Sequence, residues 1–336
     1  MKIGIDLGGS HIAIGVVDNK GKIVEKFEKR LKGIEKKHIK ETVIQYIIEN
    51  VQVLREKHKI TSVGIAIPGS VSKDTIIKSV NLGIKDFNIV EELKKEIDLP
   101  IQIRNDAKCA AIAESTYGSL KNYNRSIFLT LGTGIGGAVI INNNLLDCGE
   151  FAGCEFGHMI IEKNGKQCSC GKQGCFERYA SMKALKTNLR EVLEVGEEVS
   201  GKELFEVIRN NDILGTEEKF IKKDIFGTEE KFIKEYSESD LKSPDSKDTK
   251  AVKSEEIERV VQEFIENLSI GIANLINIFE PEAIGIGGSF VYFEEVLLDR
   301  LKTELLKENT LFNKRENITV KTAIFRNDAG IIGATI

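Results

Sequence analysis

The chain has 336 residues, of which 41% are hydrophobic and 30% charged, so it can bury two substantial cores and is not a disordered protein. Its 48 basic and 52 acidic residues leave a net charge of −4, which offers no overall attraction for nucleic acid, so we expect no nucleic-acid partner. The start MKIGIDLGG lacks the features of a signal peptide, and no apolar run reaches the roughly 18 residues of a membrane span, which predicts a cytoplasmic protein without a membrane partner.

The first segment predicts a β-hairpin with a glycine corner. The strand KIGIDL, from residue 2, runs into Gly8, Gly9 and Ser10, and the apolar run IAIGVVD follows. Backbone without side chains can approach a phosphate closely and point N–H groups at it. The corner suits phosphate binding, although an isolated Gly-Gly pair is more often an ordinary β-turn.

The next segments predict an alternation of helices and strands. Apolar residues at mixed three- and four-residue spacing predict an amphipathic helix over 40–57. The run VGIAIPGSV, at 63–71, predicts a buried strand that is broken at Pro68 and Gly69, and a further helix is expected over 89–98.

A polar pair ends the following strand. The strand IQIRND closes with Asn105 and Asp106, where the small-residue helix AKCAAIAESTYG begins. An aspartate at such a corner is more often a helix cap than a catalyst. Ligands of α/β proteins nevertheless gather at the carboxyl ends of strands, so Asp106 is also a candidate general base.

A second glycine-rich segment lies at 126–141, SIFLTLGTGIGGAVII, and contains a G-x-G-x-x-G pattern from Gly132 to Gly137. A dinucleotide-binding fingerprint should open a helix, whereas AVIINNN continues here as a strand. We therefore expect a second strand-glycine-strand hairpin. Two such hairpins would suit a duplicated domain that holds phosphates from both sides.

A possible metal site lies between residues 154 and 177, CEFGHMIIEKNGKQCSCGKQGCFE. His158, Cys168, Cys170 and Cys175 could form a closed tetrahedral shell around zinc, which would stiffen the loop and not activate water. By spacing alone, free thiols or a disulfide remain alternatives. Cys109 and Cys148 have no ligand spacing and are expected to be ordinary buried residues.

The last third of the sequence predicts a surface insertion followed by a long helix of the hydrophobic core. ILGTEEKFIK at 213–222 recurs as IFGTEEKFIK at 225–234, within an insertion placed at about 210–253. Ser254 is predicted to cap a long core helix that ends before Pro281. Its apolar positions with helical spacing are Ile257, Val260, Val261, Phe264, Ile265, Leu268, Ile272, Leu275, Ile276 and Phe279. AIGIGGSF then gives a third glycine corner, and NDAGIIGATI predicts a closely packed terminal helix.

These segments, in this order, resemble the ROK family of the actin-like ATPase superfamily, most closely its bacterial glucokinases. The most specific match is the E-x-G-H pattern ending at His158, followed by CSCGKQGCFE, with DLGGS, IPGSV, RNDA, LGTGIGG and GIGGS in the expected order. The resemblance implies an α/β fold of two actin-like (ribonuclease H-like) domains flanking an active-site cleft, with a zinc-stabilised loop. The expected domains are 1–112 with about 323–336, and 113–322.

The resemblance also implies an ATP-dependent kinase that phosphorylates the primary hydroxyl of a hexose, with D-glucose as first choice. Asp106 would be the catalytic base, and sugar hydroxyls would be bound by Asn105, Asp106, Glu155, His158 and Glu177. ATP would be held by Gly8, Gly9, Ser10, Thr133, Gly134, Gly287 and Gly288. Structural zinc would be held by His158, Cys168, Cys170 and Cys175, and Asp6 would help to place Mg²⁺.

Several alternatives stay open at this point. The acceptor could instead be N-acetylmannosamine, fructose or N-acetylglucosamine. A sugar-responsive repressor would carry a DNA-binding domain before the first phosphate motif, which begins here at residue 2, and a sugar-binding protein without activity is a third interpretation. Cys154 and His11 depart from residues common in the family. A homodimer or homotetramer is expected from the family alone.

Overall fold

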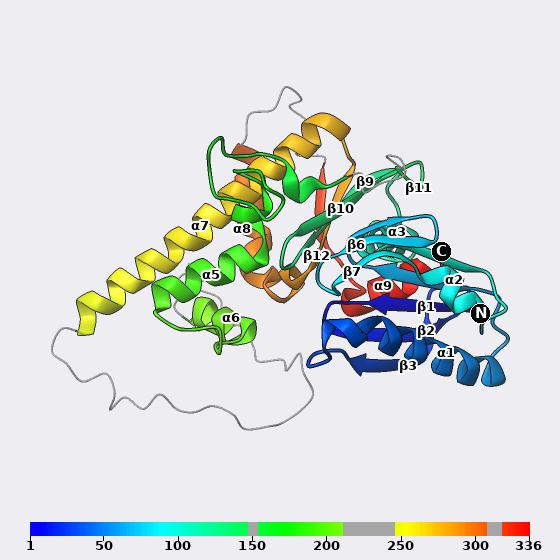
Figure 1. Ribbon diagram of the computed structural model, residues 1–336. Coiled ribbons are helices and arrows are strands. Elements are labelled where there is room, and N and C mark those ends of the chain that lie inside the picture. The colour runs from blue at the N-terminus through cyan, green and yellow to red at the C-terminus, as the bar shows by residue number, and fades with distance from the viewer. Residues whose placement is uncertain (147–153, 211–245, 308–317) are drawn as a thin grey trace.

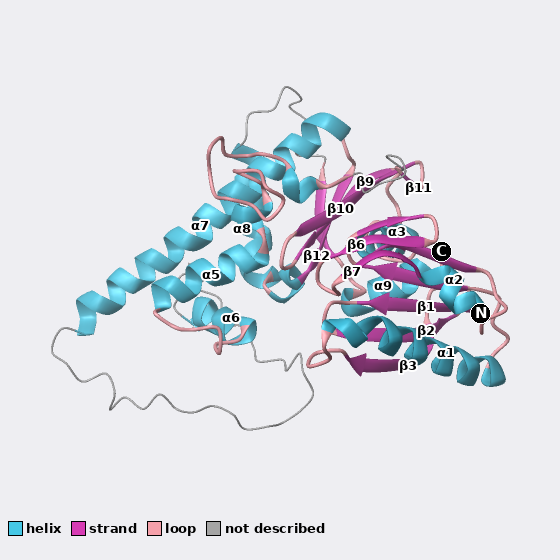
Figure 2. Cartoon of the chain, in the orientation of Figure 1, coloured by secondary structure: helices cyan, strands magenta, loops and turns pink. Residues whose placement is uncertain are grey.

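The computed structural model describes residues 1–146, 154–210, 246–307 and 318–336 of the chain. Two five-stranded sheets and the helices around them form the two halves of the molecule (Figures 1 and 2).

The first sheet has the strand order β3-β2-β1-β4-β8. Its first three strands are antiparallel neighbours, and β4 and β8 run parallel to β1. The strands are β1 Lys2–Leu7, β2 His11–Val17, β3 Ile23–Arg30, β4 Val63–Ile67 and β8 Ile101–Asn105. A small antiparallel sheet is inserted after β4 and consists of β5 Ser70–Ser72, β6 Thr75–Ser79 and β7 Ile84–Asn88.

The second sheet repeats this design with the order β11-β10-β9-β12-β13. Its strands are β9 Arg125–Leu131, β10 Ile135–Ile141, β11 Asn144–Leu145, β12 Ala283–Gly288 and β13 Thr319–Thr322. β9 and β10 form an antiparallel hairpin, and β12 and β13 run parallel to β9. The glycine-rich segment leads into a strand, as predicted, so it is not a dinucleotide-binding fingerprint.

The helices cover these sheets. They are α1 Ile39–Lys57, α2 Ile89–Lys94, α3 Asp106–Thr116, α4 Glu177–Ala180, α5 Met182–Leu193, α6 Gly201–Asn210, α7 Ser246–Phe279, α8 Glu294–Lys307 and α9 Ala329–Ala334. Single 3-10 turns are η1 Lys36–His38, η2 Phe156–His158, η4 Ser289–Tyr292 and η6 Arg326–Asp328. The apolar stripe predicted for α7 is buried in the core of the second half, apart from Phe279, which is partly buried.

Two short helices connect the halves. α3 packs against β9 and β10, α9 packs against β1 and β4, and the two helices pack against each other. Two of these contacts are close enough to require glycine. A Cβ on Gly64 of β4 would lie 1.7 Å from the carbonyl oxygen of Ala334 in α9, and one on Gly333 of α9 would lie 1.8 Å from that of Cys109 in α3. Small residues thus bring the start of α3, with Asp106, to the middle of the molecule.

Some sequence predictions need correction. Ser254 does not cap α7, which begins at Ser246, because residues 246–253 contain no glycine or proline and continue the helix. The helix expected over 89–98 ends at Lys94, and the strand expected over 63–71 is divided between β4 and β5.

Three further expectations lie partly or wholly outside the described residues. The repeats at 213–222 and 225–234, most of the insertion, and Cys148 belong to segments that the structure does not describe.

Cys109 is fully buried, as expected. Among the helices that the structure describes, none has the length and apolar character needed to cross a membrane.

Candidate active site and metal centre

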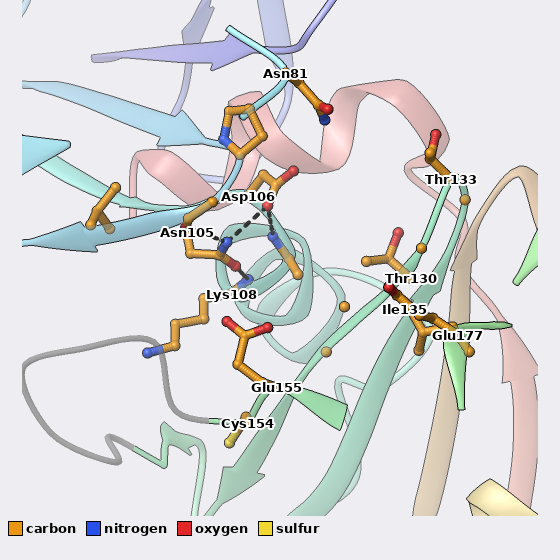
Figure 3. A pocket seen from close by; sticks show the side chains of 18 residues that line it. Asn81, Asn105, Asp106, Lys108, Thr130, Thr133, Ile135, Cys154, Glu155 and Glu177 are labelled. Atoms are coloured by element: carbon orange, nitrogen blue, oxygen red, sulfur yellow. Dashed lines mark hydrogen bonds between the residues drawn. The ribbon is translucent and has the colours of Figure 1, made fainter. Parts of the chain in front are cut away.

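A cavity of about 380 Å³ lies where the two halves meet, at the start of α3 (Figure 3). Its walls come from the loops after β4 and β6, from the β9–β10 hairpin, and from the segment before η2. The lining residues are Pro68, Gly69, Val71, Asn81, Asn105, Asp106, Ala107, Lys108, Thr130, Gly132, Thr133, Gly134, Ile135, Gly136, Gly137, Cys154, Glu155 and Glu177. Three carboxylates and two asparagines in one cavity suit a ligand with many hydroxyl groups.

Asn105, and not Asp106, is the N-cap of α3. Its Oδ1 accepts a hydrogen bond from the backbone N–H of Lys108 at 3.1 Å. Its Nδ2 donates to the carbonyl oxygen of Gly69 at 3.1 Å and to Oδ1 of Asp106 at 3.0 Å. Capping by the neighbouring residue leaves the Asp106 carboxylate in the cavity, held in place through Oδ1, which also accepts from the N–H of Ala107 at 2.8 Å.

Two carboxyl groups near the centre have altered acidity. The pKa of Asp106 is raised to about 6, chiefly by burial and also by the charge of Glu155, while hydrogen bonds from Ala107 and Asn105 oppose the rise. Burial, and then the charge of Asp106, raises the pKa of Asp6 to about 7, and Lys26 opposes this. A carboxylate whose pKa lies close to neutral is well matched to accept a proton from a hydroxyl group.

A second cavity, of about 160 Å³, also has Asp106 in its wall. It is lined by Asp6, His11, Asp106, Ala107, Ala110, Phe128, Thr130, Gly287, Gly288, Ala323, Arg326, Asn327, Ala329 and Gly330. Asp106, Ala107 and Thr130 line both cavities. Two ligands, one in each cavity, could therefore meet at the Asp106 carboxylate.

The residues of the second cavity also fit a magnesium ion. Mg²⁺ prefers carboxylate oxygens and keeps several waters. Asp6 and Asp106 are mutually repulsive carboxyls that face this space, and a divalent cation would offset their charges. Asp6 is the residue that would hold the ion, which is the role that the family resemblance implies for it.

The predicted metal ligands come together in the loop around η2. One ligand atom from each of His158, Cys168, Cys170 and Cys175 lies within 4.8 Å of all the others. Cys168 Sγ is 3.7 Å from His158 Nδ1, and Cys170 Sγ is 3.6 Å from Cys175 Sγ.

These separations discriminate between the alternatives for the cysteines. A zinc–sulfur bond of about 2.3 Å places neighbouring sulfurs of a tetrahedron about 3.8 Å apart, close to the observed spacing. A disulfide would need about 2.05 Å between the two sulfurs, and the three cysteines of this cluster are free thiols, so the disulfide alternative is wrong. The donor set fits a structural zinc ion, which closes and stiffens the loop when bound.

Glu177 connects this centre to the first cavity. Its Oε1 accepts from Cys168 Sγ at 3.3 Å and lies 3.8 Å from His158 Nδ1. Its Oε2 faces Gly134, where a Cβ would approach to 2.5 Å. The preceding residue, Phe176, is fully buried and packs over Gly271 of α7. The loop is thus anchored on the core and presents Glu177 to the cavity.

The structure brings together most of the predicted site residues, but not all. The first cavity is lined by Asn105, Asp106, Glu155, Glu177, Thr133 and Gly134, and the second by Asp6, Asp106, Gly287 and Gly288. Gly8, Gly9 and Ser10 form the β1–β2 turn and are not among the lining residues of either cavity, although Gly9 lies against Asn81. His158 belongs to the metal cluster and does not line the first cavity.

Sequence reasoning missed several lining residues. Lys108, Thr130, Arg326 and Asn327 line the cavities without having been predicted. Thr130 lies two residues before Gly132, at the end of β9, so the end of that strand was the available signal. Nothing in the local sequence around Arg326 marked it.

Comparison with known proteins agrees with this architecture. A model of the ROK family matches residues 2–223 and 229–336. The glucokinase of Streptomyces coelicolor is 29% identical over 99% of this chain and 96% of its own length. The xylose repressor of Bacillus subtilis is 28% identical over 90% of this chain and 68% of its own length.

Solved structures show the same relationship. A ROK family glucokinase from Streptomyces griseus, in complex with glucose and AMPPNP, has a TM-score of 0.70 and 26% identity, covering 99% of this chain and 97% of its own. The ROK hexokinase of Thermus thermophilus shares the fold, with a TM-score of 0.72 and 24% identity over 99% of this chain and 96% of its own. The fold is therefore the two-domain, actin-like α/β fold of these kinases, and the protein belongs to the ROK family.

Proposed function

We propose that the protein transfers the γ-phosphoryl group of ATP to the primary hydroxyl of a hexose, with D-glucose as the preferred acceptor. The observation that carries this proposal is that Asp106 lines both cavities, at the point where an acceptor and a donor would meet. The relationship to a glucokinase that binds glucose and AMPPNP supports the choice of substrates.

In this proposal the hexose occupies the first cavity. Glu155 and Glu177 accept hydrogen bonds from ring hydroxyls, and the sugar contact predicted for Asn105 completes the set, whereas His158 stays in the metal cluster outside this cavity. Asn105 also orients the base, because it donates to Asp106 Oδ1 at 3.0 Å. The metal centre acts indirectly, since Glu177 contacts both Cys168 and the cavity.

The donor phosphates occupy the second cavity and the glycine corners next to it. The acceptor hydroxyl loses its proton to Asp106 as its oxygen attacks the γ-phosphorus and the bond to the β-phosphate oxygen breaks, which yields a sugar phosphate and ADP. Phosphoryl transfer requires mainly positioning and charge stabilisation, so one base and closely approaching backbone N–H groups suffice from the protein. Mg²⁺, when bound beside Asp6, neutralises phosphate charge.

The proposal divides the chain into two domains, residues 1–112 with about 323–336 and residues 113–322. The separate cores support it, since one is built from residues between Ile3 and Ile97 and the other from residues between Ile127 and Val320. Closure of such domains would exclude water from the reacting groups.

The experiment that tests the function is ADP release by the purified protein with Mg²⁺ and ATP. The acceptors are D-glucose, N-acetylmannosamine, N-acetylglucosamine, D-fructose and D-mannose. We expect the highest kcat/KM with D-glucose. Preference for an N-acetyl sugar would keep the chemistry and overturn the choice of acceptor. Absence of turnover with every sugar would contradict the kinase and favour a sugar-binding regulator, a role consistent with the repressor relatives.

A further inference from the structure

We propose that Arg326 contacts the phosphate groups of the donor, an inference that rests on the proposed function. Arg326 lines the second cavity together with Asp6, His11 and Asp106, which are the other ionisable residues of its described lining. Arg326 is the permanently cationic member of this set, because arginine stays protonated and histidine need not.

The charge balance of the cavity argues for this role. Two carboxyl groups face the same space, so a ligand that carries several phosphate charges would be repelled unless positive groups join it. A guanidinium group offers several N–H donors in a planar arrangement that matches phosphate oxygens. Among the described residues, the ion pairs of the structure do not include Arg326, whose guanidinium group lies near the ring of Tyr292 instead of a carboxylate.

The backbone that carries Arg326 is fixed from two sides. Glu114, fully buried on α3, accepts hydrogen bonds at Oε1 from the N–H groups of Ile324 and Phe325, both at 2.9 Å. On the other side, Lys26 of β3 donates to Asp328 Oδ1 at 2.7 Å. The short turn is therefore tied to the helix that begins with Asp106 and to the first sheet.

Arg326 itself adopts an unfavourable backbone conformation. Its φ is +47°, in the left-handed region that a residue with a side chain rarely occupies. Its guanidinium carbon lies 5.9 Å from the ring centroid of Tyr292, in the turn that follows β12 and the glycine corner at Gly288. These contacts hold an exposed cation at the cavity, beside the backbone expected to receive the phosphates.

The test is a calorimetric titration of the full-length protein with ADP in the presence of Mg²⁺, and separately with adenosine. The variants are Arg326→Ala, Arg326→Lys and, as control, Arg259→Ala. Arg259 is an exposed arginine paired with Glu263 on α7, and it lines neither cavity. Adenosine shares the base and ribose of ADP and lacks its phosphates.

We expect Arg326→Ala to weaken ADP binding about tenfold, as for loss of a charge-assisted hydrogen bond, with a smaller loss for Arg326→Lys. Adenosine binding should stay the same in every variant, and Arg259→Ala should bind ADP like the wild type. Unchanged ADP affinity in Arg326→Ala, or an equal loss of adenosine affinity in that variant, would overturn the proposed phosphate contact and leave the proposed kinase function standing. Failure of the wild-type protein to bind ADP would overturn the proposed function as well.

Discussion

Replacing Asp106 with asparagine should abolish most turnover and at the same time stabilise the fold. The asparagine keeps an oxygen that can accept the hydrogen bond now donated by the N–H of Ala107, so the start of α3 should be preserved. Loss of the base should lower kcat by about 10²- to 10⁴-fold. The KM for the sugar should stay close to the wild-type value, because Glu155 and Glu177 remain.

The stability change follows from the acidity of the carboxyl group. The pKa of Asp106 rises from 3.8 to about 6 in the folded protein, chiefly through burial. This difference corresponds to about 3 kcal/mol at 1.36 kcal/mol per pH unit, an upper bound because the side chain is partly open to cavity water. Since the folded-state pKa is the higher one, the ionised carboxylate destabilises the fold fully above about pH 6, and the penalty vanishes below about pH 4.

Urea denaturation at pH 7.5 and at pH 3.5 measures this effect, and Asp98→Asn provides a control at an exposed aspartate. Asp106→Asn should gain up to about 3 kcal/mol at pH 7.5 and nothing at pH 3.5. The wild-type kcat/KM should fall as the pH drops below about 6, where Asp106 becomes protonated. Full turnover in Asp106→Asn would refute the assignment of the base. Equal or lower stability at pH 7.5 would refute the argument from burial.

Three further changes test the metal centre and the packing between the halves. Cys168→Ala should reduce the zinc content measured by mass spectrometry, because a ligand is lost, and should raise the KM for the sugar, because Glu177 loses a partner. The control Cys109→Ala should keep its zinc. Normal zinc content in Cys168→Ala would contradict the ligand set. Glu114→Gln should lower the free energy of unfolding by about 1 to 3 kcal/mol, since an amide cannot accept all four recorded hydrogen bonds, and an unchanged urea midpoint would refute this. Gly64→Ala should lower the melting temperature, because its Cβ would lie 1.7 Å from a backbone oxygen of α9; a variant as stable as wild type would show that this contact can relax.

Much of the architecture could be predicted because its signals are local. Each strand-glycine-strand hairpin has its alternating or buried apolar run and its turn within about 15 residues, and both hairpins were found. The helical spacing of apolar residues likewise located the core face of α7. The start of α7 was misplaced because a charged segment without helix breakers is compatible both with a helix and with a loop.

The candidate site was predicted less completely because its parts are far apart in the sequence. Asn105 and Asp106 are neighbours, yet only the hydrogen bond from Lys108 shows which of them caps the helix. Glu114 and Phe325 are 211 positions apart, and their contact depends on the packing of α3 beside the last segment of the chain. No local pattern could therefore reveal that Arg326 reaches the second cavity.

The most direct test of the central claim is to identify the atom that is phosphorylated. The wild-type protein is incubated with Mg²⁺, ATP and D-glucose, the product is analysed by phosphorus NMR, and 6-deoxy-D-glucose is used in parallel. If Asp106 deprotonates a primary hydroxyl between the two cavities, the phosphate should be found on the oxygen at carbon 6, and the deoxy sugar should yield no product. Phosphate at another hydroxyl, or turnover of the deoxy sugar, would contradict the account.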